Sequence, residues 1–282
     1  MTTEEVKFKI SFVYLVPILA SLIFGLGCTW LLKPQHEQAP IPPSAVMPFP
    51  DDTISGPIGN ALLYVVLAAI GATVFLILIK RRKVKLVKSV IFLVMTTVSM
   101  MLSLLYISEL LSYTSFYSDF LLVGLSILIT VLFDLAIFKY TKAQSVAVIG
   151  LGGALGAVMA FAFPPYSVIA VLIALAIYDI IAVYRGPVGK IAQAGLDQLP
   201  GLSYSFKDIQ MGLGDLIFYT VLTGSMFFSF PNSILPTIMS IIGICIGSII
   251  TFLMLEKKRI FPGLPFPIAL GLALGLLTAL FI

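Results

Sequence analysis

The chain has 282 residues, of which 60% are hydrophobic and only 11% are charged, and its mean hydropathy is +1.11. A soluble domain carries about 25% charged residues, so this composition excludes an ordinary soluble protein and predicts a single membrane domain over residues 1–282. The net charge of +4 does not indicate nucleic-acid binding, because the basic residues fall at the ends of apolar runs, where a membrane surface explains them.

Nine apolar runs are each long enough to cross a bilayer as a helix, which needs about 20 residues. We therefore expect an all-α polytopic membrane protein with nine transmembrane helices. A proline-rich loop at 33–57 separates the first two runs, and a second substantial loop lies at 186–207. The fifth run contains GLGGALGA at 150–157, whose small residues permit close helix approach. The nine expected spans are about 8–32, 58–79, 89–112, 119–138, 143–163, 165–184, 208–230, 233–255 and 262–282.

The basic residues are distributed unevenly between the two sides of this arrangement. If the N-terminus is cytoplasmic, 16 of the 17 Lys and Arg residues lie in cytoplasmic segments, and only Lys33 lies outside. Short cytoplasmic loops of membrane proteins carry an excess of Lys and Arg. The sequence therefore predicts a cytoplasmic N-terminus, a C-terminus outside, an outside loop at 33–57 and a cytoplasmic loop at 186–207.

Three aspartates, Asp134, Asp179 and Asp215, fall inside the expected spans, where a charged side chain costs about 2.5–3.5 kcal/mol to insert. Asp134 is near Lys139 and Lys142 in the chain, which leaves a structural pairing open for it. Asp179 is expected ~9 Å below the cytoplasmic end of span six, and Asp215 ~10 Å below the cytoplasmic start of span seven. Because these two spans are antiparallel neighbours, the two carboxylates are expected at matching depth.

Two facing carboxylates make a particular hydrolysis possible. Like charges a few ångströms apart cannot both ionise, so the pair shares one proton. The ionised member draws a proton from water while the protonated member polarises a peptide carbonyl. A zinc-dependent protease or a protease with a Ser–His dyad would need a histidine within the membrane. The one histidine, His36, lies in the expected outside loop. No metal or organic cofactor is expected.

Sequence motifs surround both acids and the start of the last span. The first acid is part of a YD pair, Tyr178–Asp179, within IYDIIAVYRGP. The last expected span begins with FPGLPFPIALG. The second acid completes a GxGD pattern within KDIQMGLGDLIFYTVLTG, formed by Gly212, Leu213, Gly214 and Asp215.

In this order, and on spans six, seven and nine, the three segments resemble the presenilin and signal-peptide-peptidase family of intramembrane aspartyl proteases. The resemblance is strongest in the C-terminal part of the chain. It implies a presenilin-like fold and hydrolysis of peptide bonds within the transmembrane segments of membrane protein substrates. It also implies that Asp179 and Asp215 are the catalytic residues.

The family's third motif is Pro-Ala-Leu, and the matching residues here are Pro262, Gly263 and Leu264, followed by Pro265. Glycine replaces alanine, and we expect this exchange to be mild because both residues are small. The prolines leave backbone groups unpaired, which offers a substrate an edge to join as an added strand.

The remaining motif residues are expected to shape the site. Gly212 and Gly214 remove side chains beside Asp215, so that substrate or another backbone segment can approach it. Glycine costs about 1 kcal/mol relative to alanine inside a helix, which suggests a purpose for the pair. Tyr178 is expected to form a hydrogen bond near the site or to line the pocket.

The predicted orientation matches presenilins rather than signal peptide peptidases, which are inverted. The compact chain is similar to an archaeal presenilin homologue, which implies activity without accessory subunits and a place in the cell membrane. Its expected partners are a transmembrane helix of each substrate and membrane lipid. The sequence leaves self-association into a homo-oligomer open.

Two other functions use the same acids. A proton-coupled transporter or cation leak channel would use them as a relay, although the two halves of the chain show no evident repeat. A prepilin-type peptidase is also a membrane GxGD enzyme, but the YD and PGLP segments fit it poorly.

Overall fold

The computed structural model describes residues 12–38, 47–81, 83–114, 118–186, 201–206, 209–230, 233–258 and 261–281. Within these ranges the chain forms nine α-helices, a 3-10 turn and a two-stranded antiparallel sheet. The elements are η1 (Phe12–Leu15), α1 (Val16–Gln38), α2 (Ser55–Lys80), α3 (Val84–Ser112), α4 (Asp119–Phe138), α5 (Thr141–Ala162), α6 (Pro165–Tyr184), β1 (Ser203–Phe206), β2 (Ile209–Gly212), α8 (Leu213–Ser229), α9 (Ile234–Lys258) and α10 (Pro265–Leu280).

The helices form because apolar segments in a bilayer must satisfy every backbone N–H and C=O internally. In the part of the chain that the structure describes, seven helices have the length and hydropathy of a membrane span, and α8 and α10 are shorter apolar helices. The expected polytopic helical membrane fold is therefore confirmed.

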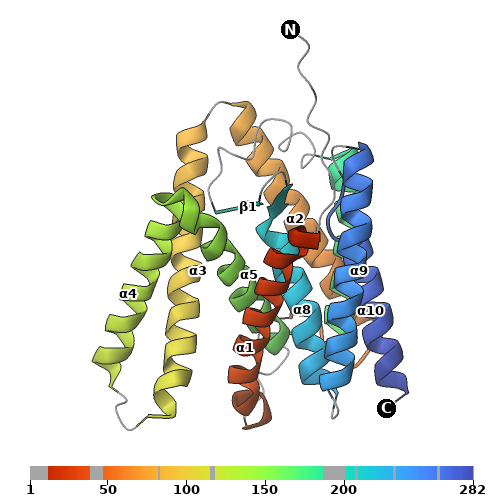
Figure 1. Ribbon diagram of the computed structural model, residues 1–282, viewed down its shortest axis with the longest axis horizontal. Coiled ribbons are helices and arrows are strands. Elements are labelled where there is room, and N and C mark those ends of the chain that lie inside the picture. The colour runs from red at the N-terminus through yellow and green to blue at the C-terminus, as the bar shows by residue number, and fades with distance from the viewer. Residues whose placement is uncertain are drawn as a thin grey trace.

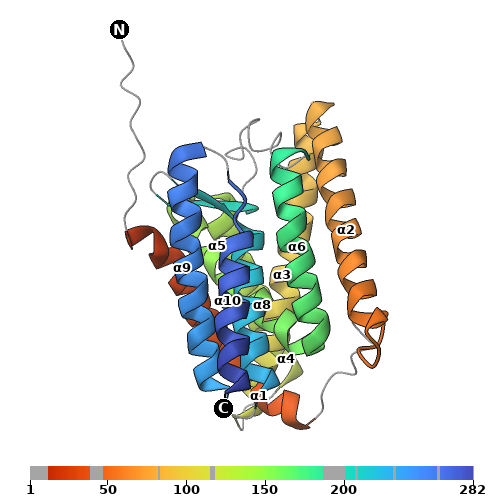
Figure 2. The same ribbon diagram turned by 90° about the vertical axis from the view of Figure 1, so that its right-hand side faces the viewer.

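The helices are arranged around a central group made by α1, α5 and α8 (Figure 1). Helices α3 and α4 pair on one side of this group, and α9 and α10 pair on the other. Helix α2 packs mainly against α6, and α6 also contacts α8 and α10 (Figure 2). Helix α8 is thus the most enclosed helix, whereas α2 and α6 lie at the edge of the bundle.

The glycine-rich segment of α5 brings three helix backbones together. A Cβ atom on Gly153 would lie 2.6 Å from the carbonyl oxygen of Ser21 on α1. A Cβ atom on Gly156 would lie 2.6 Å from the carbonyl oxygen of Ile217 on α8. Neither position has room for a side chain, so the small residues permit close packing and fix the distance between α5 and α8.

The structure differs from the expected spans around two loops. The seventh helix begins at Leu213 rather than near residue 208, because β2 occupies Ile209–Gly212. Helix α1 continues to Gln38, past the expected loop start at residue 33, because hydropathy marks where apolar side chains end and not where backbone hydrogen bonding ends. The expected loop at 186–207 contains β1, and its residues 187–200 and 207 lie outside the described residues, as do residues 39–46 of the other loop.

A polar network fixes the beginning of α6 to the segment that precedes α2. Asp51 Oδ2 accepts hydrogen bonds from the backbone N–H groups of Tyr166 and Ser167, each at 3.1 Å. The Ser167 hydroxyl donates to Asp51 Oδ1 and accepts from Asn60 Nδ2 at 2.8 Å. Asn60 also donates to the carbonyl of Phe49 at 2.8 Å. The first N–H groups of a helix have no partner within it, so Asp51 caps α6 from a distant part of the chain.

Candidate active site

The end of α6 and the beginnings of α8 and α10 meet at one end of the bundle, which we call the Arg185 end (Figure 2). Asp179 lies in the last part of α6, and Asp215 is the third residue of α8. The residues 261–264 lead into α10 and lie between these two helices' carboxylates.

Asp179 contacts the backbone just before α10. The N–H of Leu264 donates to Asp179 Oδ2 at 3.0 Å. Leu264 is the residue before the first turn of α10, and its N–H has no acceptor within that helix because the first N–H groups of any helix lack one. The carboxylate of Asp179 therefore caps α10 from α6.

Asp215 contacts the neighbouring residue of the same segment. A Cβ atom on Gly263 would lie 2.7 Å from Asp215 Oδ2 and 2.8 Å from both Oδ1 and Cγ. The carboxylate of Asp215 thus lies directly against the Cα of Gly263. Since Asp179 bonds to Leu264 and Asp215 touches Gly263, the two carboxylates meet at one dipeptide, and they interact with each other electrostatically.

The glycine at position 263 has a steric reason. A real Cβ atom does not approach a heavy atom closer than 3.0 Å, so alanine would push against the Asp215 carboxylate. Alanine here would require the Asp215 carboxylate to move. The expectation that the exchange of glycine for alanine is mild therefore stays a prediction.

Gly212 and Gly214 have room for a side chain instead. Among the described residues, a Cβ atom on Gly212 would lie 3.7 Å from Asp215 Oδ2 and one on Gly214 would lie 3.9 Å from Phe218, both ordinary contacts. Gly214 is exposed. Asp215 is therefore packed tightly against Gly263, and less tightly against Gly212 and Gly214.

The β-hairpin leads directly into Asp215. Strands β1 and β2 are antiparallel, with Ser203 opposite Gly212. The N–H of Leu213, the next residue, donates to the carbonyl of Leu202 at 2.9 Å, and the Leu213 side chain is buried. Backbone hydrogen bonds thus fix the path of the chain up to the first turn of α8.

Tyr178 lies beside Asp179 on α6. Its hydroxyl is buried and has no hydrogen-bond partner among the residues that the structure describes. A buried hydroxyl without a partner is costly, which makes this group available to a molecule that enters the site.

The prolines of the third motif flank the contact dipeptide. Pro262 is buried, and Pro265 occupies the first turn of α10, where its missing N–H removes no helix hydrogen bond. Gly263 and Leu264 are consequently the two residues of the Pro262–Pro265 segment that carry a backbone N–H.

Sequence reasoning missed Tyr219. Its side chain is only 1% exposed, and its hydroxyl donates to the carbonyl of Gly263 at 2.8 Å. Tyr219 lies one helical turn after Asp215, on the same face of α8. That spacing is the signal that would have indicated it, but within DLIFYTVL the tyrosine resembles an ordinary packing residue.

Asp134 forms a hydrogen bond with a neighbouring helix. The hydroxyl of Thr96 on α3 donates to Asp134 Oδ2 at 2.8 Å, and Oδ1 is buried without a hydrogen-bond partner among the described residues. Asp134 is thus bonded to α3.

Comparisons with known proteins agree on the family. The family model described as signal-peptide peptidase, presenilin aspartyl protease matches residues 51–197, which include Asp179 and end before Asp215. Presenilin-B of Dictyostelium discoideum is 31% identical over 120 residues, which are 39% of this chain and 25% of that protein. The chain thus spans about a quarter of the length of the curated relative that it matches.

Two solved structures share the fold. Both are described as a presenilin family intramembrane aspartate protease, in the C222 and P2 space groups. The first has a TM-score of 0.67 at 17% identity and covers 95% of this chain and 99% of its own. The second has a TM-score of 0.64 at 18% identity and covers 95% and 98%. With a family model that matches more than half of its residues, this chain belongs to the signal-peptide peptidase and presenilin family of aspartyl proteases.

Proposed function

We propose that this protein is an intramembrane endopeptidase in which Asp179 and Asp215 activate water to hydrolyse a peptide bond of a substrate's transmembrane segment. One observation carries the proposal: carboxylates from α6 and α8 meet at the Gly263–Leu264 dipeptide. Family membership supports the same chemistry.

The reaction follows from two carboxylates that share one proton. The ionised carboxylate removes a proton from water, and the resulting hydroxide attacks the substrate carbonyl. The protonated carboxylate donates to the carbonyl oxygen, so no charged oxygen develops unpaired in an apolar site. Collapse of the tetrahedral intermediate returns a proton to the leaving amine. No covalent intermediate and no cofactor is required.

The substrate would reach the acids from the side of Gly212 and Gly214, where an added Cβ atom would make only ordinary contacts with the described residues. A transmembrane helix must unwind locally before its peptide bonds can be attacked. The strand β2 offers backbone groups to such an unwound segment. The Gly263 C=O and the Leu264 N–H of the proline-flanked segment already have partners within the protein, Tyr219 and Asp179. The unpaired hydroxyl of Tyr178 adds a hydrogen-bonding group beside Asp179.

The charge distribution supports a location of this site near the cytoplasmic surface of the cell membrane, with the N-terminus inside and the C-terminus outside. Substrates would then present their N-terminus outside. The protein would act in contact with membrane lipid and without accessory subunits, as a monomer or as a homo-oligomer.

The test is cleavage of a single-span substrate with its N-terminus outside, by purified protein in liposomes. Wild type is compared with Asp179→Ala and Asp215→Ala, with and without a transition-state-analogue inhibitor of aspartyl proteases. We expect each substitution to reduce the rate by about 10² to 10⁴, the contribution of a positioned acid or base. Cleavage that survives either substitution contradicts the mechanism. Proton or cation flux that needs both acids, without cleavage by wild type, would instead support the transporter or channel.

A further inference from the structure

We propose that Tyr219 positions the catalytic pair by holding the Gly263–Leu264 peptide that binds Asp179, an inference that rests on the proposed function. The first step is that two hydrogen bonds involve the same peptide group. Tyr219 donates to the Gly263 carbonyl at 2.8 Å, and the N–H of Leu264 donates to Asp179 Oδ2 at 3.0 Å. The C=O and N–H of a trans peptide point in opposite directions. One planar group thus accepts from α8 and donates to α6.

The second step is that this peptide has few other ways to be held. Pro262 and Pro265 flank the dipeptide and carry no N–H. The peptide precedes the first turn of α10, so the helix does not use its N–H. Its orientation therefore depends on the two side chains that bind it.

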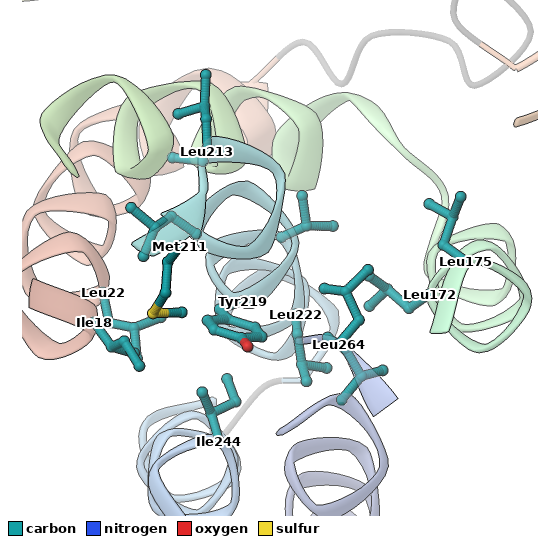
Figure 3. Packing of buried hydrophobic residues seen from close by; sticks show 14 of the residues in the cluster. Ile18, Leu22, Leu172, Leu175, Met211, Leu213, Tyr219, Leu222, Ile244 and Leu264 are labelled. Atoms are coloured by element: carbon teal, nitrogen blue, oxygen red, sulfur yellow. The ribbon is translucent and has the colours of Figure 1, made fainter. Parts of the chain in front are cut away.

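The third step places Tyr219 and Asp215 on one rigid element. They are one turn apart on α8, the helix that α5 approaches through glycine. Asp215 touches the Cα of Gly263, and Tyr219 binds its carbonyl. Tyr219 is 1% exposed and lies within the buried cluster, with Leu222, Ile244 and Leu264 around it (Figure 3). Helix α8 thus carries the Asp215 carboxylate itself, and it orients the Asp179 carboxylate through the Gly263–Leu264 peptide.

The fourth step is the effect on the chemistry. Hydrogen bonds in a chain polarise one another, so the bond from Tyr219 strengthens the donor that orients Asp179. Without the hydroxyl, the peptide loses one anchor and the two carboxylates lose their fixed separation. Catalysis is sensitive to such small displacements. Tyr219 touches neither water nor substrate in this scheme, so it is a positioning residue.

The test compares Tyr219→Phe with a matched control, Tyr106→Phe, in the full-length protein in liposomes. The hydroxyl of Tyr106 on α3 also donates to a backbone carbonyl, that of Ala154, at 2.8 Å, but it does not contact the acids' dipeptide. For Tyr219→Phe we expect kcat to fall about tenfold, with KM within about twofold, and binding of the transition-state analogue to weaken in parallel with kcat. For Tyr106→Phe we expect a comparable loss of thermal stability, with kcat and analogue affinity within about twofold of wild type.

The outcomes separate this inference from the proposed function. If wild type cleaves and needs both acids while Tyr219→Phe behaves like Tyr106→Phe, the positioning role is wrong and the protease remains. If KM rises with kcat unchanged, Tyr219 acts on substrate binding, which also overturns the inference. If wild type does not cleave, both the protease and the positioning role fail.

Discussion

An aspartate lies at each end of α6, and the two aspartates have different partners. At the beginning of the helix, Asp51 uses both carboxylate oxygens, which accept from two backbone N–H groups and from the Ser167 hydroxyl. Near its end, Asp179 accepts from the N–H of Leu264 and lies beside a second carboxylate, that of Asp215. One aspartate joins two segments of the chain, whereas the other is brought against a like charge.

The difference shows how to separate a structural acid from a functional one. A carboxylate surrounded by donors stabilises the fold, because each charge-assisted hydrogen bond favours the folded state. A second carboxylate nearby does the opposite, since like charges repel. An arrangement that costs stability and is nevertheless built from three helices indicates a function.

Apart from substitution of the two acids themselves, the largest effect is expected at the Arg185 end, from Gly263→Ala. The added Cβ would lie 2.7 Å from the Asp215 carboxylate, which must move. We expect kcat to fall about a hundredfold with little change in thermal stability, because a displacement of about 1 Å at a reacting group costs about that much. The control is Gly124→Ala on α4, where none of the described residues would lie within 4 Å of the added Cβ atom. Equal activity of the two variants would show that the close contact between Gly263 and Asp215 does not affect catalysis.

The other end of α6 should respond in stability instead. In Asp51→Ala the N–H groups of Tyr166 and Ser167 lose their acceptor. We expect the free energy of unfolding in detergent to fall by about 1.5–3 kcal/mol, the range for a hydrogen bond to a charged group, with kcat unchanged. Asp52→Ala is the control, because Asp52 is exposed. A lower kcat without a change in stability would remove the distinction between the two ends.

The smallest effect is expected at Asp134, which tests the distinction on a third acid. Asn at this position keeps an oxygen that accepts the hydrogen bond from Thr96. We expect Asp134→Asn to leave the rate of cleavage and the equilibrium constant of unfolding within about twofold of wild type. One hydrogen bond is retained and no charge pair is broken. Loss of activity with normal folding would place Asp134 in a proton pathway and favour the transporter.

Apolar runs predict the helices well because bilayer thickness dictates helix length. Helices α4 and α6 have the same bounds as the runs at 119–138 and 165–184. The hairpin before α8 was not predicted. Its strands, SYSF and IQMG, have four residues each, and a hydropathy average over about 20 residues does not detect segments that short. The end of α1 was also placed too early, since polar residues such as Gln38 can continue a helix.

The charged residues of the candidate site could be predicted from the sequence, but the residues that act through packing could not. Asp179 and Asp215 are conspicuous because carboxylates are rare in spans. The role of Asp51 depends on Ser167, which is 116 residues away in the chain. Tyr219 and the close contact at Gly263 likewise depend on how α8 and α10 pack, and a local pattern contains no such information.

The contact between Gly263 and Asp215 also constrains how the sequence can evolve. With the carboxylate in the place of a methyl group, a larger residue at 263 requires the Asp215 side chain or α8 to move. The glycine packing of α5 against α8 limits how far that helix can shift. We therefore expect a change from glycine to alanine at 263 to be epistatic, with an effect that depends on the residues of the α5–α8 interface.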